Sequence, residues 1–334
     1  LFGLHRYLKC HSAAENLEIV GRNGQHWTPS TRQCTDCHSA IEMHSQRACI
    51  VLLALLQRTC SLRPVRAISL DITGTLVTHK GSVVQHYVDA AVWARLDNPP
   101  SVDEMKPAFK AAYKERCVES PCFGGAEGIS GRDWWRGTAR RVMELCGRSY
   151  AADDFDRWFR RVYQHFGSPK GYEVLPDAAT FLNKIPDSYL LGICSNTPNR
   201  HSASVLPMLG IHERFKFFAS SQDVGHEKPD SQIFEDAFRQ AQFWLPDLKR
   251  DEVLHVGDSL ACDFCGARAF GFQALLLDRS ANEKVVAYQD WVQAPDYEGK
   301  SAADIENGTV RSLADVVALV EISNAEPGAF IRVM

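Results

Sequence analysis

A run with strand character that ends at an acidic side chain constrains this chain more than any other feature. Residues 65–70 place Val, Ala, Ile and Leu in an alternating pattern that predicts a β-strand, and Asp71 and Gly74 predict a turn where that strand ends. A carboxylate at such a turn can act as a nucleophile that forms an acyl-phosphate. On its own, the string 71–77 is better explained by an Asp that starts a tight turn.

Three further polar motifs follow in order along the chain. The apolar run 189–194 predicts a buried strand that ends in Ser195 and Asn196. A helix expected at 201–209 would bring free N–H groups near Ser195, where they favour an anion. The third motif is a loop lysine, Lys228, immediately before a proline.

The fourth motif is a second carboxylate at a strand end. The run 253–257 ends in Asp258, and Asp263 follows five positions later. About 30 residues separate Ser195 from Lys228 and Lys228 from Asp258, which suits one strand-helix unit each. These residues can therefore converge at the carboxyl edge of one parallel sheet.

Together the four motifs supply the groups that phosphoryl transfer needs. Asp71 and Asp258 can hold one Mg²⁺, Lys228 supplies a positive charge against phosphate, and Ser195 donates a hydrogen bond. Each residue alone has an ordinary explanation, as a turn former, a solvated lysine or a helix cap. Their joint occurrence, in order and at strand ends or in loops, favours the site.

The motifs resemble motifs one to four of the haloacid dehalogenase superfamily, over residues 64–325. The strings 133–135 (Asp-Trp-Trp) and 255–269 resemble the hydrolase domain-containing protein 3 branch more closely. The resemblance implies an α/β fold, with a Rossmann-like parallel sheet core and an all-helical cap domain inserted after the first strand. The expected divisions are a leader at 1–64, a core at 65–83 and 187–325, a cap at 84–186 and a tail at 326–334.

The same resemblance implies roles for individual residues. Asp71 would be the nucleophile and, with the main-chain carbonyl of Thr73 and with Asp258, would bind Mg²⁺. Asp263 would orient the residues of the site without binding the metal directly. The residues expected to hold phosphate are Thr75, Ser195, Asn196 and Lys228.

One position departs from the superfamily pattern. Its phosphatases usually carry a second Asp two residues after the nucleophile, as general acid and base, and here that position is Thr73. A positioned general acid typically contributes ~10²–10⁴-fold to the rate. Threonine at this position should therefore slow the hydrolysis of alkyl phosphates most, and that of acyl or aryl phosphates least.

The stretch between the first two motifs is predicted to be helical. Residues 151–167 place aromatic and aliphatic side chains at the spacing of an amphipathic helix, and segments near 84–96, 102–117 and 131–146 also have helical character. We expect the aromatic side chains of this block to form its own core, Trp134 and Trp135 included. A cap over the site would exclude water and select the substrate.

Residues 1–64 hold five of the chain's 11 Cys and five of its 12 His. The string 34–38 has the spacing of a c-type haem attachment, and the Cys and His density also permits zinc, but no second paired motif completes a zinc site. An extended leader is the expected interpretation, with a weak transit-peptide signal.

Composition narrows the class of protein. Hydrophobic residues make up 45% of the 334 residues, enough for a sizeable core, and a net charge of −4 argues against a nucleic-acid surface. The longest apolar run, 48–56, is too short to span a membrane as a helix. Cys194, Cys262 and Cys265 are expected to be small core residues in a reducing, intracellular compartment, cytoplasmic or nuclear unless the leader directs the chain to an organelle.

Three functions remain open at this stage. The favoured one is a Mg²⁺-dependent phosphatase that acts on a small phosphorylated molecule. The first alternative is a 2-haloacid dehalogenase, in which Asp71 would attack carbon without a metal and Asp258 would be idle. The second is a catalytically weak binding or scaffold protein, for which Thr73 is the best support. The sequence predicts neither the substrate nor the oligomeric state.

Overall fold

The computed structural model describes residues 19–20, 26–27, 62–279 and 292–325. The expected haem or zinc motif, almost all of the expected leader and the whole expected tail at 326–334 lie outside the described residues. A short antiparallel ribbon pairs β1 (Ile19–Val20) with β2 (His26–Trp27). Within the described ranges, no helix is both long enough and apolar enough to cross a membrane.

The centre of the molecule is a six-stranded sheet in which all neighbouring strands run parallel. Its strand order places the strand before Asp71, β3, between β8 and β6. A strand buried on both faces needs a nearly continuous apolar sequence, as the sequence predicts for these strands. In sheet order the strands are β10 (Thr309–Val310), β9 (Gln273–Leu277), β8 (Val253–Gly257), β3 (Ala67–Leu70), β6 (Leu190–Ser195) and β7 (Phe217–Ser220).

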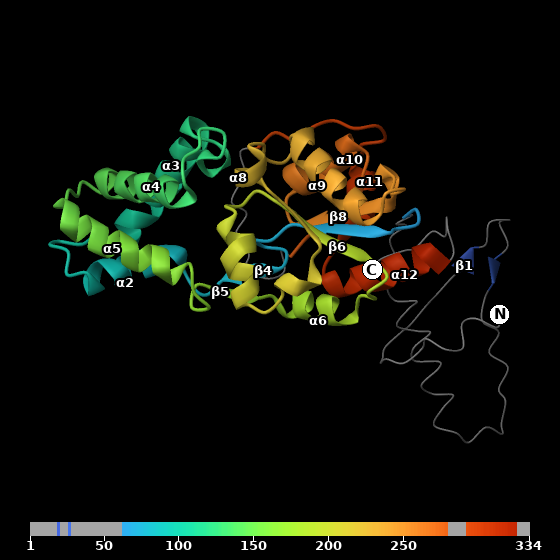
Figure 1. Cartoon of the computed structure of the whole chain (residues 1–334), viewed down its shortest axis with the longest axis horizontal. Helices are drawn as coiled ribbons and strands as arrows, with labels where there is room; N and C mark the ends of the chain where they lie inside the picture. Colours follow the sequence, from blue (N-terminus) through green and yellow to red (C-terminus); the bar gives the residue numbers. More distant parts are fainter. Residues whose placement is uncertain (1–18, 21–25, 28–61, 280–291, 326–334) are drawn as a thin grey trace, which may run out of the picture.

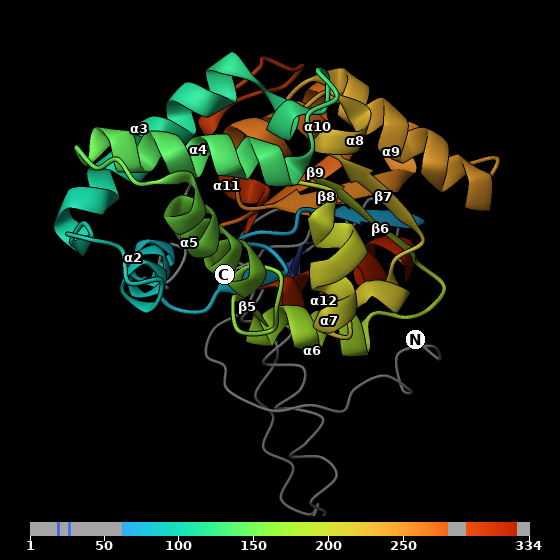
Figure 2. The same cartoon turned by 60° about the vertical axis from the view of Figure 1, so that its left-hand side comes forward.

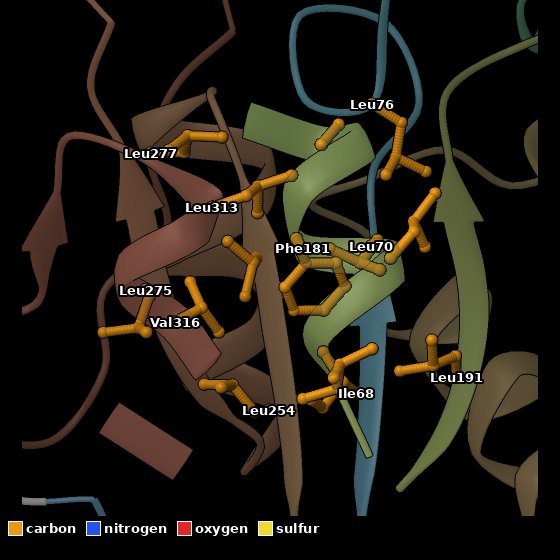
Figure 3. Close-up of a cluster of buried hydrophobic side chains, with 14 of the residues drawn as sticks. Ile68, Leu70, Leu76, Phe181, Leu191, Leu254, Leu275, Leu277, Leu313 and Val316 are labelled. Atoms are coloured by element: carbon orange, nitrogen blue, oxygen red, sulfur yellow. The ribbon is translucent and has the colours of Figure 1, made fainter. Parts of the chain in front are cut away.

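Helices cover both faces of the sheet (Figures 1 and 2). On one face α6 (Pro176–Lys184) and α12 (Leu313–Ala325) pack together, and Ile68 and Leu70 of β3 point toward them (Figure 3). On the other face lie α9 (Ser231–Trp244) and α10 (Gly266–Phe270). The remaining short elements of the core are η3 (His201–Val205), α7 (Leu206–Met208), η4 (His212–Arg214), α8 (Ser221–Val224), η5 (Arg250–Glu252), η6 (Leu260–Cys265) and α11 (Ala302–Asn307).

The polypeptide leaves this core and returns to it through a two-stranded ribbon. β4 (Val77–His79) pairs antiparallel with β5 (Tyr172–Val174), and a group of helices lies between them in sequence. This group projects to one side of the sheet, at the left of Figure 1. The fold is therefore an α/β core with an inserted helical cap. The cap helices are α2 (Val83–Trp93), α3 (Val102–Glu119), η2 (Cys122–Gly124), α4 (Gly131–Leu145) and α5 (Ala152–His165).

The cap has a hydrophobic core of its own. Trp158 of α5 is fully buried, packs edge-on against Tyr87 of α2, and donates its indole N–H to the Tyr87 carbonyl at 3.0 Å. Serine side chains accept hydrogen bonds at the N-termini of α2, α3 and α4, which satisfies otherwise unpaired N–H groups. The four helices begin and end within a few residues of the predicted ranges.

Candidate active site

Asp71 leaves the sheet at the carboxyl end of its central strand. Its backbone N–H donates to the carbonyl of Val256 on β8 at 3.0 Å, and the residue is 7% exposed. Gly74, three residues later, has a φ of +88°, and a Cβ there would lie 2.2 Å from Oδ2 of Asp258. Glycine is required at this position by the backbone conformation and by the close approach of the second carboxylate.

Lys228 lies between two carboxylates. Its Nζ donates to Oδ1 of Asp71 at 2.8 Å, to Oδ1 of Asp263 at 2.5 Å and to the main-chain carbonyl of Cys194 at 2.8 Å, so all three donors are used. Burial alone would lower the lysine pKa, but the two carboxylates outweigh it and the pKa of Lys228 is raised. The loop lysine singled out in the sequence is thus a fixed positive charge beside Asp71.

Ser195 is the last residue of β6, and its hydroxyl donates to Oδ1 of Asp71 at 2.9 Å. The structure brings this residue to the site. Helical conformation begins at His201, as the sequence predicts, although its first turn is π-helical. It acts on the site through its own hydroxyl.

Asn196 lines the cavity beside Asp71. Its side-chain Oδ1 accepts from the backbone N–H of Lys228 at 2.6 Å, and Nδ2 donates to the Lys228 carbonyl at 2.8 Å. Both ends of the amide therefore hold the loop that carries Lys228. The expected contact of Asn196 with phosphate stays a prediction.

Asp263 is held from three sides. Its Oδ1 accepts from Lys228 and faces Nε2 of His255 at 3.0 Å, and its Oδ2 accepts from the backbone N–H of Ser259 at 2.8 Å. The other ring nitrogen of His255 lies 3.0 Å from the hydroxyl of Ser69 on β3. Burial would raise the pKa of Asp263, but Lys228 and His255 outweigh it and hold the pKa below its usual range.

Around Asp71, acidic side chains outnumber basic ones. Asp71, Asp258 and Asp263 each offer an oxygen ligand, and these atoms lie within 4.8 Å of one another. Lys228 is the only cationic side chain among the described residues that line the adjoining cavity. Burial, together with Asp71 and Asp263, raises the pKa of Asp258 well above its usual value. A cluster of carboxylate oxygens with uncompensated charge fits a hard divalent cation.

The two threonines predicted in the site lie in different surroundings. Thr73 is half-buried and lines the cavity above Asp71. Thr75 is fully buried, and its hydroxyl has no hydrogen-bond partner among the described residues. Its main-chain carbonyl accepts a hydrogen bond at 3.0 Å from Arg279, which lies beyond the last predicted motif.

Arg279 is a site residue that the motifs did not indicate. It is 8% exposed, donates to the carbonyls of Gly74 and Thr75, and pairs with Asp177 of α6 at 2.7 Å. It therefore holds the turn after Asp71 against the segment through which the chain returns from the cap. No local pattern could have revealed it, because its partners are 205, 204 and 102 residues away in the sequence.

Above the carboxylates lies a cavity of about 410 Å³ between core and cap. We call Asp71, Lys228, Asp258 and Asp263 the cavity floor. The cavity walls are the larger or polar side chains farther from the sheet. From the cap they are Val83, Phe109, Tyr113, Phe123 and Trp135, and from the core His79, Tyr172, Thr197 and His201.

One wall residue corrects a prediction about the cap. Trp134 is fully buried, as expected for a core residue. Its neighbour Trp135 is only partly buried and faces the cavity, so it is not simply part of the cap core. Helical periodicity cannot separate these cases, because a side chain covered by its own domain and one covered by a second domain show the same apolar pattern.

Known proteins resemble this chain in sequence. The haloacid dehalogenase-like hydrolase family matches residues 65–271. The haloacid dehalogenase-like hydrolase domain-containing protein 3 of Danio rerio is 30% identical over 222 residues, which cover 66% of this chain and 88% of that protein. The human protein of the same name is 28% identical over 214 residues, covering 64% of this chain and 82% of the relative.

Solved structures share the fold at lower identity. A 2-haloacid dehalogenase from Pseudomonas syringae is 17% identical with a TM-score of 0.53. The match covers 77% of this chain and 98% of the dehalogenase. The HAD-hydrolase YfnB from Bacillus subtilis, solved bound to magnesium, is 19% identical with a TM-score of 0.51, and the match covers 78% of this chain and 100% of YfnB. By its sequence and by its parallel-sheet fold, this chain belongs to the haloacid dehalogenase-like hydrolase family.

Proposed function

We propose that this protein is a Mg²⁺-dependent phosphatase that hydrolyses a small-molecule phosphate ester through a phosphorylated Asp71. The observation that carries the proposal is the cavity floor. A buried nucleophile candidate accepts hydrogen bonds from Lys228 and Ser195, and a second carboxylate, Asp258, lies close beside it. A phosphoryl group there would meet a positive charge and a hydroxyl donor.

The excess of negative charge supports a metal. Asp71, Asp258 and the main-chain carbonyl of Thr73 would hold Mg²⁺, and Asp263, committed to Lys228, His255 and Ser259, would stay behind them. When bound, the ion would neutralise charge on the phosphoryl oxygens. A metal-free dehalogenase would leave Asp258 without a partner for its charge. The magnesium found in the Bacillus subtilis relative is consistent with this assignment.

The proposed reaction has two displacements. A carboxylate oxygen of Asp71 attacks phosphorus, and the bond to the leaving oxygen breaks with its electron pair on that oxygen. Water then attacks the phosphorus of phospho-Asp71, and the acyl-phosphate bond breaks to release phosphate and the carboxylate. Lys228 stabilises the charge that develops in both steps from a fixed position.

The leaving oxygen has no evident proton donor. Thr73 stands where the family's phosphatases carry an acid, and a threonine hydroxyl does not protonate a leaving group at neutral pH. None of the described cap residues that line the cavity carries a carboxyl group. The structure thus offers no replacement acid from the cap, and substrates with good leaving groups are favoured.

A matched set of assays tests the proposal. Aryl, acyl and alkyl phosphates and a 2-chloroalkanoate are each incubated with the full chain, with Mg²⁺ and with a chelator. Phosphate release that requires Mg²⁺ is expected. Halide release that is independent of metal would replace the proposal with the dehalogenase alternative. Absence of both, in protein shown by circular dichroism to be folded, would favour a binding or scaffold role.

A further inference from the structure

The walls of the cavity are dominated by aromatic rings. Phe123 and Trp135 of the cap lie with ring centroids 6.3 Å apart, and Tyr113 stacks on Trp135 at 5.8 Å. Tyr172 of the core packs against His79 at 4.8 Å and against His201 at 5.4 Å. Cap and core therefore both present rings to the same space, which is the lining expected for a flat apolar ligand.

The walls carry no charge at neutral pH. Burial, and then the nearby His86, lower the pKa of His79 to about 4, while burial and then His79 lower the pKa of His201 to about 3. The other described lining residues outside the floor have no ionised side chain. A second anionic group on a substrate would thus find no cation among the described residues of the walls.

A second cavity of about 330 Å³ adjoins the first and shares His79, Phe109, Trp135 and Tyr172 with it. Two arginines line this second space. The guanidinium of Arg200 lies 3.8 Å from the Tyr163 ring centroid and donates to the Tyr163 carbonyl at 2.8 Å, so it is already engaged.

The other arginine, Arg132, is exposed to solvent. Neither arginine lines the first cavity, directly above Asp71. The space in which the group next to phosphate would sit is therefore free of positive charge among the described residues, apart from Lys228 on the floor.

One polar group in the walls lacks a partner. Thr197 follows β6, is 5% exposed and lines the first cavity, and its hydroxyl has no hydrogen-bond partner among the described residues. A buried polar atom without a partner costs stability unless a ligand or water satisfies it. This hydroxyl is suited to bind a polar substituent on an otherwise apolar ligand.

We propose that the substrate is a phosphate monoester of an uncharged aromatic alcohol, with its ring system between the cap and core rings and a polar substituent at Thr197. The inference deepens the proposed function and rests on it for the placement of phosphate at Asp71. It excludes sugar bisphosphates, phosphorylated carboxylic acids and 2-haloacids as good ligands, because each brings a second charge or a carboxylate into neutral walls.

The test compares phosphates whose leaving groups are all phenols, so that the absent general acid affects them alike. Phenyl, 2-naphthyl and 3-carboxyphenyl phosphate are assayed with the full chain and Mg²⁺. We expect kcat/KM for the naphthyl ester to exceed that for phenyl by roughly tenfold, and the carboxyphenyl ester to fall roughly tenfold below phenyl. Equal values for phenyl and naphthyl, or a preference for the carboxylate, would overturn the inference.

Two wall variants and one control variant test whether the effect comes from the walls. Trp135→Leu should remove most of the naphthyl preference, whereas Trp93→Leu, at an exposed cap position outside the cavity, should keep it. Tyr113→Arg places a cation in the walls and should raise kcat/KM for the carboxyphenyl ester by roughly tenfold. A naphthyl preference that survives Trp135→Leu unchanged would also count against the inference.

A binding measurement separates this inference from the proposed function. Naphthylmethylphosphonate and methylphosphonate, which cannot be hydrolysed, are titrated calorimetrically into the full chain with Mg²⁺. Tighter binding of the aromatic phosphonate without any ester hydrolysis would support the aromatic binding site and contradict the proposed phosphatase function. Ester hydrolysis without aromatic preference in either assay would support the phosphatase function and contradict the aromatic binding site.

Discussion

The cavity floor and the cavity walls are built in opposite ways. The floor consists of charged side chains from strand ends, a loop and the helical turn η6 of the core, joined by hydrogen bonds that reach from Asp71 through Lys228 to Asp263. The walls consist mainly of neutral rings, four of them from the cap and three from the core, and include the hydroxyl of Thr197, which has no hydrogen-bond partner among the described residues. The difference indicates a division of labour, because fixed charges act on any phosphoryl group whereas shape and polarity distinguish the groups that carry it.

The arrangement of the wall residues depends on contact between cap and core, whereas that of the floor residues does not. The floor is fixed by the parallel sheet and by Arg279. The walls form only while cap and core are in contact. One such contact joins Gln222 of the core to the cap, where its side chain donates to the Phe123 carbonyl at 3.5 Å. Substitutions in the floor should therefore change the chemical step, and substitutions between cap and core should change binding.

Removing the nucleophile should give the largest effect. Asp71→Asn keeps the size of the side chain but removes its charge and nucleophilicity, so turnover should fall by roughly 10⁴-fold or more and trapping by beryllium fluoride should be lost. Steady-state kinetics and intact-protein mass spectrometry measure both. Asp187→Asn, at a side chain that is 91% exposed, is the control. Turnover near the wild-type level in Asp71→Asn would show that the floor does not work through a phospho-enzyme.

Restoring an acid above the floor should give the next largest effect. Thr73→Asp should raise the turnover of alkyl phosphates by ~10²–10⁴-fold, because poor leaving groups depend most on protonation, and aryl phosphates should gain less. Thr73→Asn, similar in shape to Asp but unable to supply the proton, is the matched control. The same modest rates for both variants, together with a flat leaving-group dependence in the wild type, would mean that Thr73 only shapes the turn.

The positions of the floor residues follow from the local sequence far more directly than those of the wall residues. Asp71 and Asp258 each follow an apolar strand and Ser195 ends one, so local pattern and parallel topology together place them at one edge of the sheet. His255 escaped assignment because it lies inside such a strand, where its apolar neighbours conceal a polar contact made across the sheet.

The walls depend on contacts between distant segments. Trp135 and Tyr172 face the same cavity from the cap and from the returning ribbon, and nothing in either local sequence specifies that meeting. The sequence therefore predicted a cap and its helices, but not which of their side chains would face the core. For this reason Trp135 was predicted to lie in the core of the cap, although it faces the cavity.

Forcing cap and core apart should have a smaller effect than changing the floor. A Cβ at Gly125 would lie 2.0 Å from the main-chain oxygen of Gln222, so Gly125→Val should displace the η2 loop from α8. We expect kcat/KM to fall between about 10- and 100-fold, as for other misplaced binding groups. Faster hydrogen exchange in α8 would accompany the loss.

Gly137→Ala is the matched control for that variant. The nearest atoms to its Cβ would be those of the Arg116 side chain on α3, 3.7 Å away, which is an ordinary contact inside the cap, and kinetics and exchange should stay as in the wild type. Wild-type kinetics in Gly125→Val as well would mean that the contact around Gln222 does not control access to the floor.

The smallest expected effect concerns the neutrality of the walls. Burial, and then His86, lower the pKa of His79 in the folded protein to about 4, against an ordinary value near 6.5 in the unfolded chain. Between those two pH values the unfolded chain binds more protons than the folded one, so stability is retained above pH 6.5 and is lost as pH falls toward 4. The free energy of unfolding should decrease by up to about 1.4 kcal/mol per pH unit from this residue.

His79→Phe removes that titration and keeps a ring of similar shape between Phe166 and Tyr172, whose centroids lie 5.7 and 4.8 Å from the imidazole. Urea denaturation at pH 7.5 and pH 5 should therefore show a smaller loss of stability in the variant than in the wild type. His201 still contributes in both proteins, because its own pKa is lowered to about 3, so some pH dependence should remain. An unchanged loss in His79→Phe would mean that His79 is protonated in the folded protein already at pH 5. The walls would then carry a positive charge in that pH range, and the contrast with the floor would hold only nearer neutrality.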